Sequence, residues 1–275
     1  MVRKILVKTF IALVLIMLYL PIIWMIVFSF TETPSFSDWS GFSFNNYINL
    51  FNGTGPNAGK IQEALINTIF VGFFVSLLST VLGTLGAIGL HAIHSKRIKA
   101  TYNTVNQIPM INSEIVTAIA LALVFNLFAS MFKINDGSWG ITAFKLILAQ
   151  TTFCAPYVLL NVLPRLQKSD NKIYEAALDL GCTPAKAMFK VVIPDILPGI
   201  VVGALLSFTL SIDDFVITKV NVTSFETLST LLYGLKNGKH PLPADIRALF
   251  TIIFFIVFAL MMILYSPRKK QEVKK

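Results

Sequence analysis

Three acidic residues stand in or beside long apolar stretches of this chain: Glu114, Asp213 and Asp214. A carboxylate in a membrane segment is costly, so it marks a candidate functional site, here one that contacts a cation. The rings of Phe153 and Tyr157 can add cation–π contacts if they face the same path.

The two aspartates are neighbours, and adjacent side chains differ by about 100° around a helix. At most one of them is therefore expected to face a path fully, while the other can cap backbone groups. A purely structural role of Asp213 and Asp214 at a helix end stays open. Glu114 is expected near the cytoplasmic end of its span, as a structural or gate-side residue.

The polar segment Glu175–Pro194 lies between two apolar stretches. Its composition favours a different role, the docking of a soluble partner. Ala176 and Ala177 are small enough to let a partner surface approach, and Glu175 offers a carboxylate for a charged hydrogen bond. The alternative is a solvated amphipathic loop in which Glu175 pairs only with Lys172 or other neighbours.

Capping signals in this segment predict two helices joined by a turn, lying across one membrane face. The first helix runs to Leu180, where Gly181 stops it. The second is expected to be short and to end before the next apolar span. The residues that carry these signals are Asp170 or Asn171, Thr183 and Pro184 at the starts, and Pro194 and Pro198 at the end.

Composition indicates a membrane protein. The chain has 275 residues, of which 55% are hydrophobic and 13% charged, and its mean hydropathy is +0.72. A soluble domain carries about 25% charged residues, so lipid must cover much of this surface. The net charge is +9. The basic residues cluster in short loops beside apolar stretches, which is typical of membrane topology rather than of nucleic-acid binding.

Six stretches are long enough to cross the hydrocarbon core, which takes about 20 apolar residues. The first is too long for a signal peptide, and no Ala-x-Ala cleavage site follows it. The chain is therefore predicted to be an all-α membrane protein of six spans in one domain, residues 1–275. The expected spans are roughly residues 9–30, 66–91, 108–132, 141–163, 197–217 and 246–265.

Shorter patterns add detail to these spans. Segments Trp39–Phe51 and Ser224–Leu235 are predicted to be amphipathic helices on the membrane surface. Rows of small residues let helix backbones approach closely in lipid. These rows are Gly83, Gly86 and Gly89 in the second span, and Gly199, Gly203 and Ser207 in the fifth.

The distribution of basic residues predicts the orientation. Both ends of the chain, the loop around Lys96 and the loop that holds Glu175 carry 16 Lys and Arg, and the opposite loops carry 6. The positive-inside rule then places both termini and the Glu175 loop in the cytoplasm, an arrangement that requires an even number of spans.

The chain lacks recognisable catalytic machinery. Lys60 follows a glycine, but Thr54 and Ile61 break the P-loop pattern. Cys154 and Cys182 are far apart in different segments, so neither a disulfide nor a zinc site is expected. Neighbouring aspartates on one helix do not form an aspartyl protease pair. The histidines, His91, His94 and His240, show no metal-binding spacing.

The segment from Glu175 resembles the "EAA" signature of the membrane subunits of ATP-binding-cassette importers: Glu-Ala-Ala, three residues, Gly, nine residues, Ile, any residue, Leu-Pro. Val191 stands for the Ile and Ile193 for the Leu, apolar for apolar. The positions kept are Glu175, Ala176, Ala177, Gly181 and Pro194.

Further motifs over nearly the whole chain resemble the permeases of polyamine importers, in particular the second, PotC-type permease of spermidine/putrescine systems. They are Tyr19-Leu20-Pro21-Ile22, Phe28-Ser29-Phe30, Trp39-Ser40-Gly41-Phe42, Ile108-Pro109-Met110, Glu114-Ile115-Val116, Thr151-Thr152-Phe153-Cys154-Ala155-Pro156 and Leu210–Thr218.

The resemblance implies a type I importer (MetI-like) transmembrane domain in a bacterial inner membrane, not an enzyme and without a cofactor of its own. It implies a homologous second permease as heterodimer partner, two ATPase subunits that bind ATP and Mg, and an external polyamine-binding protein. The coupling loop would cover about residues 165–196. Related permeases carry other small organic solutes, so that alternative stays open. An independent channel or carrier would not need this loop, and no internal repeat is evident.

Overall fold

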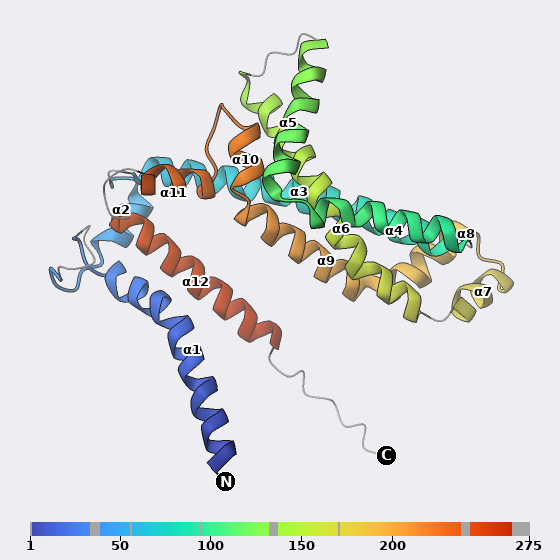
Figure 1. Ribbon diagram of the computed structural model, residues 1–275, viewed down its shortest axis with the longest axis horizontal. Helices are drawn as coiled ribbons and strands as arrows, with labels where there is room; N and C mark the ends of the chain where they lie inside the picture. The colour runs from blue at the N-terminus through green and yellow to red at the C-terminus, as the bar shows by residue number, and fades with distance from the viewer. Residues whose placement is uncertain are drawn as a thin grey trace. The chain divides into compact units, whose positions relative to one another are not determined.

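The structure is a computed structural model that describes residues 2–33, 39–55, 57–93, 95–131, 137–169, 171–237 and 243–265 (Figure 1). His94, Asp170 and His240 lie outside these residues. Within the described ranges the regular secondary structure is helical, without strands. The helices are α1 (Val2–Ser29), α2 (Asn45–Asn52), α3 (Ala58–Ala92), α4 (Lys96–Ile111), α5 (Glu114–Met131), α6 (Trp139–Lys168), α7 (Asn171–Asp179), α8 (Pro184–Ala187), the π-helical segment η1 (Met188–Val192), α9 (Ile193–Asp213), α10 (Val216–Asn221), α11 (Leu228–Asn237) and α12 (Ala244–Tyr265).

Contacts divide the chain into two compact units. One combines Met1–Glu63 with Tyr233–Lys275 and contains α1, α2 and α12, and the other is Ala64–Leu232 and contains α4 to α10. The candidate site residues at positions 114 to 214 all belong to the second unit.

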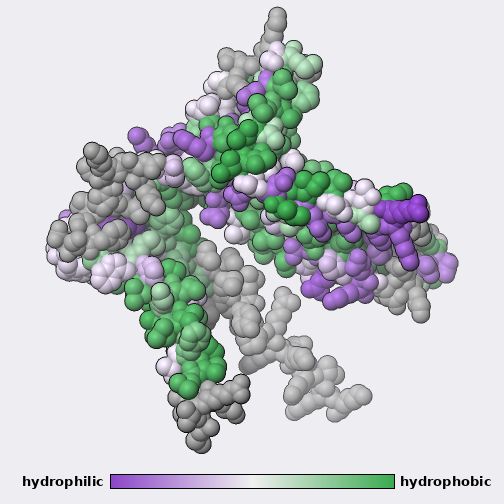
Figure 2. Space-filling view, in the orientation of Figure 1, coloured by the Kyte–Doolittle hydropathy of each residue, from purple (hydrophilic) through white to green (hydrophobic). Residues whose placement is uncertain are grey.

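Five helical stretches of the described chain are long and apolar enough to cross a membrane: Leu6–Ser29, Ala58–Ala92, Glu114–Met131, Trp139–Lys168 and Pro184–Asp213. The sixth expected span coincides with α12, a helix of 22 residues, and the count of six stays a prediction. Most large apolar side chains of α1 are exposed, and Figure 2 shows them as a hydrophobic surface. Such a surface suits lipid or another membrane helix rather than water.

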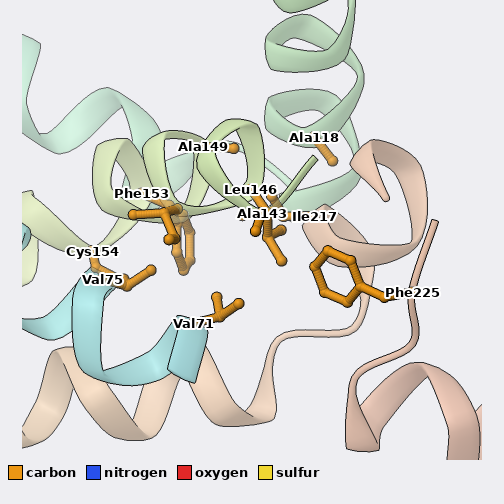
Figure 3. Packing of buried hydrophobic residues seen from close by; sticks show 11 residues of the cluster. Val71, Val75, Ala118, Ala143, Leu146, Ala149, Phe153, Cys154, Ile217 and Phe225 are labelled. Atoms are coloured by element: carbon orange, nitrogen blue, oxygen red, sulfur yellow. The ribbon is translucent and has the colours of Figure 1, made fainter. Parts of the chain in front are cut away.

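The core of the second unit forms around α6, which buries about half of its residues against neighbouring helices. Figure 3 shows the cluster that contains Val75, Leu146, Phe153 and Ile217 from α3, α6 and α10. In lipid the hydrophobic effect does not drive helices together, so van der Waals packing of this kind holds membrane helices in place.

Small residues allow two of these helices to approach α6 closely. A Cβ on Gly83 of α3 would lie 2.7 Å from Cβ of Val158, and one on Gly203 of α9 would lie 3.0 Å from Cγ1 of the same residue. The predicted contact role of the small rows is therefore confirmed at these positions. At Gly89 a Cβ would meet nothing within 4 Å in the described part of this chain, so a contact role for Gly89 stays a prediction.

Two predicted spans are each interrupted, which corrects their expected bounds. The stretch 108–132 is divided between α4 and α5, because Asn112 is extended (φ −68°, ψ 148°) and the Ser113 carbonyl accepts hydrogen bonds from the first turn of α5. The stretch 197–217 is divided between α9 and α10, because Asp214 is extended. Each break places an acidic residue at a helix end.

The first predicted surface helix is observed as α2, which begins at Asn45 rather than near Trp39 and ends at Gly53 with φ +70°. The second is observed as α11. In the loop before α2, Glu32 accepts hydrogen bonds of 2.7 Å from Ser43 Oγ and from Asn45 Nδ2. These donors favour the ionised carboxylate and lower the pKa of Glu32 below its ordinary value.

Candidate coupling loop and substrate path

The loop that carries the Glu-Ala-Ala sequence folds as a helix closed by a tight turn. Helix α7 ends at Asp179, and Gly181 follows with φ +83°. The Gly181 N–H donates to the Leu178 carbonyl (2.9 Å), and the Cys182 N–H donates to the Ala177 carbonyl (3.1 Å). These two bonds define a Schellman motif, which satisfies carbonyls that a helix end leaves open. The predicted glycine stop is confirmed.

The side chains of this helix divide into an inner and an outer face. Ala177 is buried, and α7 contacts α8 and η1, whereas Glu175 and Ala176 are exposed. Leu180, at the end of α7, is 87% exposed, the largest exposed fraction among the large apolar residues of the described chain. An exposed carboxylate, a small residue and an apolar side chain together form a surface that a protein partner can cover.

The second half of the loop differs from the expected short helix. Thr183 caps it, accepting a hydrogen bond from the Lys186 N–H, and Pro184 is at its first position, as predicted. The helix does not end at Pro194 or Pro198, however, and instead continues without a break from Pro184 to Asp213.

The π-helical segment η1 explains how Pro194 is accommodated. A proline removes the hydrogen bond to the carbonyl four residues earlier and crowds that carbonyl. Just before it, the Ile193 N–H donates to the Met188 carbonyl, a bond over five residues that widens the turn. Pro194 itself is exposed. The turn at Gly181 and the membrane-spanning part of α9 are thus joined by one continuous helix.

At the other end of α9, Asp214 is held by four hydrogen bonds to its carboxylate. Oδ2 accepts from Gln150 Nε2 (2.9 Å), the Thr218 N–H (2.9 Å) and Thr218 Oγ1 (2.7 Å), and Oδ1 accepts from the Ile217 N–H (3.2 Å). Asp214 therefore caps the start of α10, the role considered for one member of the pair.

Asp213 is in a different environment. It is the last residue of α9, its side chain is exposed, and among the described residues it makes no hydrogen bond or ion pair. The two neighbouring carboxylates therefore differ in their surroundings: that of Asp214 accepts four hydrogen bonds, whereas that of Asp213 is exposed and accepts none from the described residues.

The other candidate path residues are spread over α5 and α6. Phe153 is only 6% exposed and belongs to the core cluster (Figure 3). Tyr157 is half-buried, with its ring centroid 5.5 Å from that of Phe153. Glu114 is exposed at the first position of α5. Within this chain Tyr157 and Glu114 are more accessible than Phe153.

Three residues of the Asp214 network were not among the sequence-based candidates: Gln150, Ser211 and Thr218. The signal available in the sequence was an amide, Gln150, in the middle of an apolar stretch, where a polar side chain needs a partner. The partner itself is 64 residues away and could not be read from the sequence. The described residues contain no group of three His, Cys, Asp or Glu that could hold a metal ion.

Comparisons with known proteins identify the family of this chain. Residues 79–271 match the family described as binding-protein-dependent transport system inner membrane component. The chain is 34% identical over 248 residues to the spermidine/putrescine transport system permease protein PotC of Haemophilus influenzae, covering 90% of both chains. It is 30% identical to the putrescine transport system permease protein PotI of Escherichia coli, covering 86% of this chain and 81% of that one.

A solved structure has the same fold. A chain of the bacterial alginate ABC transporter in complex with an alginate pentasaccharide-bound periplasmic protein superposes with a TM-score of 0.70 at 20% identity, covering 96% of this chain and 92% of that one. This chain is an inner membrane permease of an ATP-binding-cassette importer, a non-catalytic subunit that spans the membrane several times. It belongs to the binding-protein-dependent transport family and, within it, to the PotC-type permeases.

Proposed function

We propose that this permease carries polyamines and that the exposed carboxylate of Asp213 receives the cation. The observation that carries the proposal is the contrast between the two aspartates. The charge of Asp214 is compensated by four donors, whereas Asp213 has none among the described residues.

The helix break strengthens the negative potential at Asp213. The C-terminal end of an α-helix carries a partial negative charge of roughly −0.5, and its last carbonyls lack partners within the helix. Asp213 ends α9, so its carboxylate and the helix terminus act together on a nearby cation. Broken helices in other transporters use their C-terminal ends for cations in the same way.

The relatives suit this chemistry, since spermidine and putrescine are flexible polycations, and the PotC and PotI proteins are named for their transport. Tyr157 and Glu114, accessible on α6 and α5, extend the proposed path beyond Asp213. Phe153 would serve mainly by supporting Tyr157.

Energy would come from partner subunits. We propose that Glu175, Ala176 and Leu180 dock into a cytoplasmic ATPase subunit that binds ATP and Mg, and that Gly181 sets the angle of the docking helix. Ala177 and Pro194 support this surface from within the loop. A complete importer would contain a second permease, two ATPases and an external polyamine-binding protein. Both termini and this loop would face the cytoplasm.

The test is uptake by the reconstituted complex with putrescine, spermidine and a neutral solute of similar size. Replacement of Asp213 by Asn keeps the shape and removes the charge. A hydrogen bond to a charged group contributes about 1.5–3 kcal/mol, so we expect polyamine uptake to fall ~10- to 100-fold, at about 1.4 kcal/mol per factor of ten.

A matched control is Glu63→Gln, which likewise removes the charge of an exposed acid, on α3 and outside both the coupling loop and the proposed path. It should leave uptake close to the wild-type rate. If Asp213→Asn transports polyamines normally, or if the complex prefers the neutral solute, the cationic path at Asp213 is wrong.

A further inference from the structure

The amide of Gln150 lies at the point where α9 breaks. It is 1% exposed in the middle of α6, and both ends of the amide are used. Nε2 donates to Asp214 Oδ2 (2.9 Å) and to Thr218 Oγ1 (3.0 Å), and Oε1 accepts from Ser211 Oγ (2.5 Å). One side chain therefore contacts the last turn of α9, the break itself and the start of α10.

The break depends on the backbone of one residue. Phe215 already lies in the right-handed helical region (φ −105°, ψ −41°), and α10 begins directly after it. Asp214 alone is extended, with φ −63° and ψ 119°. Its φ is that of a helix, in which ψ is about −42°, so rotation about this single bond would bring α9 and α10 toward one helix.

The contacts of Asp214 oppose that rotation. Its side chain is tied to Gln150 and Thr218, and its own carbonyl accepts a hydrogen bond from Ser229 Oγ (2.7 Å). Among the described residues, Gln150 is the one side-chain donor to this carboxylate from outside α10. The Asp214 side chain is half-buried, so a hydrogen bond lost from its carboxylate is only partly replaced by solvent, which favours a change of conformation.

We infer that Gln150 is a positioning residue: by holding Asp214 extended it ends α9 at Asp213 and keeps the Asp213 carboxylate exposed toward the substrate. This inference rests on the proposed function, in which Asp213 meets the cation. It assigns the two aspartates different tasks, with Asp214 fixing the break and Asp213 contacting the polyamine.

The experiment measures the accessibility of position 213 directly. Asp213→Cys is introduced into a Cys182→Ser background, which retains the buried Cys154. The full complex is reconstituted and treated with a membrane-impermeant, cationic thiol reagent, and labelling of the parent without Asp213→Cys is subtracted. A second variant adds Gln150→Leu, which has similar size and no amide.

We expect position 213 to react readily with Gln150 present and ~10-fold more slowly with Gln150→Leu, the effect of a lost hydrogen bond to a charged group. Uptake by Gln150→Leu in the otherwise wild-type chain should fall by a similar factor while assembly and basal ATP hydrolysis persist. The matched control is Asn161→Leu, which also replaces an amide of α6 by leucine; among the described residues this amide donates to the Tyr157 carbonyl of its own helix.

The outcomes separate the two ideas. Equal labelling with and without Gln150 overturns the positioning role and leaves the proposed path at Asp213 intact. No labelling in either background shows that position 213 is not on an aqueous path and overturns both. If Gln150→Leu does not assemble, Thr218→Val replaces it, since this change removes two hydrogen bonds to Asp214 and one from Gln150 at nearly constant shape. Unchanged labelling with Thr218→Val then refutes the inference.

Discussion

The turn at Gly181 allows a quantitative test of the docking loop. Gly181 has φ +83°, and a Cβ added there would meet nothing within 4 Å. An added Cβ therefore makes no clash within the described part of this chain, so Gly181→Ala acts through backbone conformation. An L-residue in the left-handed region costs roughly 1–2 kcal/mol. A β-branched residue is strained there still more.

This cost falls on a local, exposed structure. Because the Schellman bonds of Gly181 and Cys182 close the turn, strain of 1–2 kcal/mol lowers the population of the closed turn by roughly 5- to 30-fold relative to open forms. Asn tolerates the left-handed conformation better than other non-glycine residues. We therefore expect the coupling between substrate and ATP hydrolysis to decrease in the order Gly181→Asn, Gly181→Ala, Gly181→Val.

The assay compares basal and substrate-stimulated ATP hydrolysis in the reconstituted complex, together with uptake. Binding of the substrate by the external receptor should not change. Gly140→Ala is a control, since a Cβ at Gly140 also meets nothing within 4 Å and its φ is not positive. Equal coupling in the Asn and Val variants would refute the conformational argument, and normal coupling in a Gly181→Val, Glu175→Lys double variant would refute the docking role itself.

Three further outcomes follow from the structure. Asp214→Asn should impair assembly or thermal stability as well as uptake, because it weakens the cap of α10, and a variant that transports slowly but melts normally would contradict this. Gly83→Val should lower the melting temperature of the complex, since overpacking costs about 1–3 kcal/mol and its Cβ would lie 2.7 Å from Val158; an unchanged melting temperature would show that α3 can shift. Cysteine at the exposed position Lys186 should react only with a permeant reagent and cysteine at Lys60 from outside, and external labelling at Lys186 would reject the predicted orientation.

Features that depend on local sequence were predicted well. The stop at Gly181 and the cap at Thr183 require only residues within one turn, so the spacing of Gly, Thr and Pro was sufficient. The helical membrane class follows from composition, and the family follows from the Glu175 signature. Close approach at Gly83 and Gly203 was likewise visible as rows of small residues.

Features that depend on distant contacts were not predicted. Continued apolar sequence through Phe215 and Val216 suggested that the fifth span ran on to Ile217. The structure ends it at Asp213, because Gln150, far away in the chain, stabilises an extended Asp214. Pro194 was expected to end a helix. Instead, the π-helical hydrogen bonds of η1 accommodate the proline, and no local residue signals this change from α-helical to π-helical bonding.

These two corrections act together. With Pro194 accommodated, the helix that begins just after the Gly181 turn is the same helix that ends at Asp213, and its 30 residues span about 45 Å at 1.5 Å per residue. The turn that follows the proposed docking helix α7 and the carboxylate proposed to meet the polyamine therefore lie at opposite ends of one continuous helix. The break fixed by Gln150 determines where that helix stops, and so which of the two aspartates is available to the substrate.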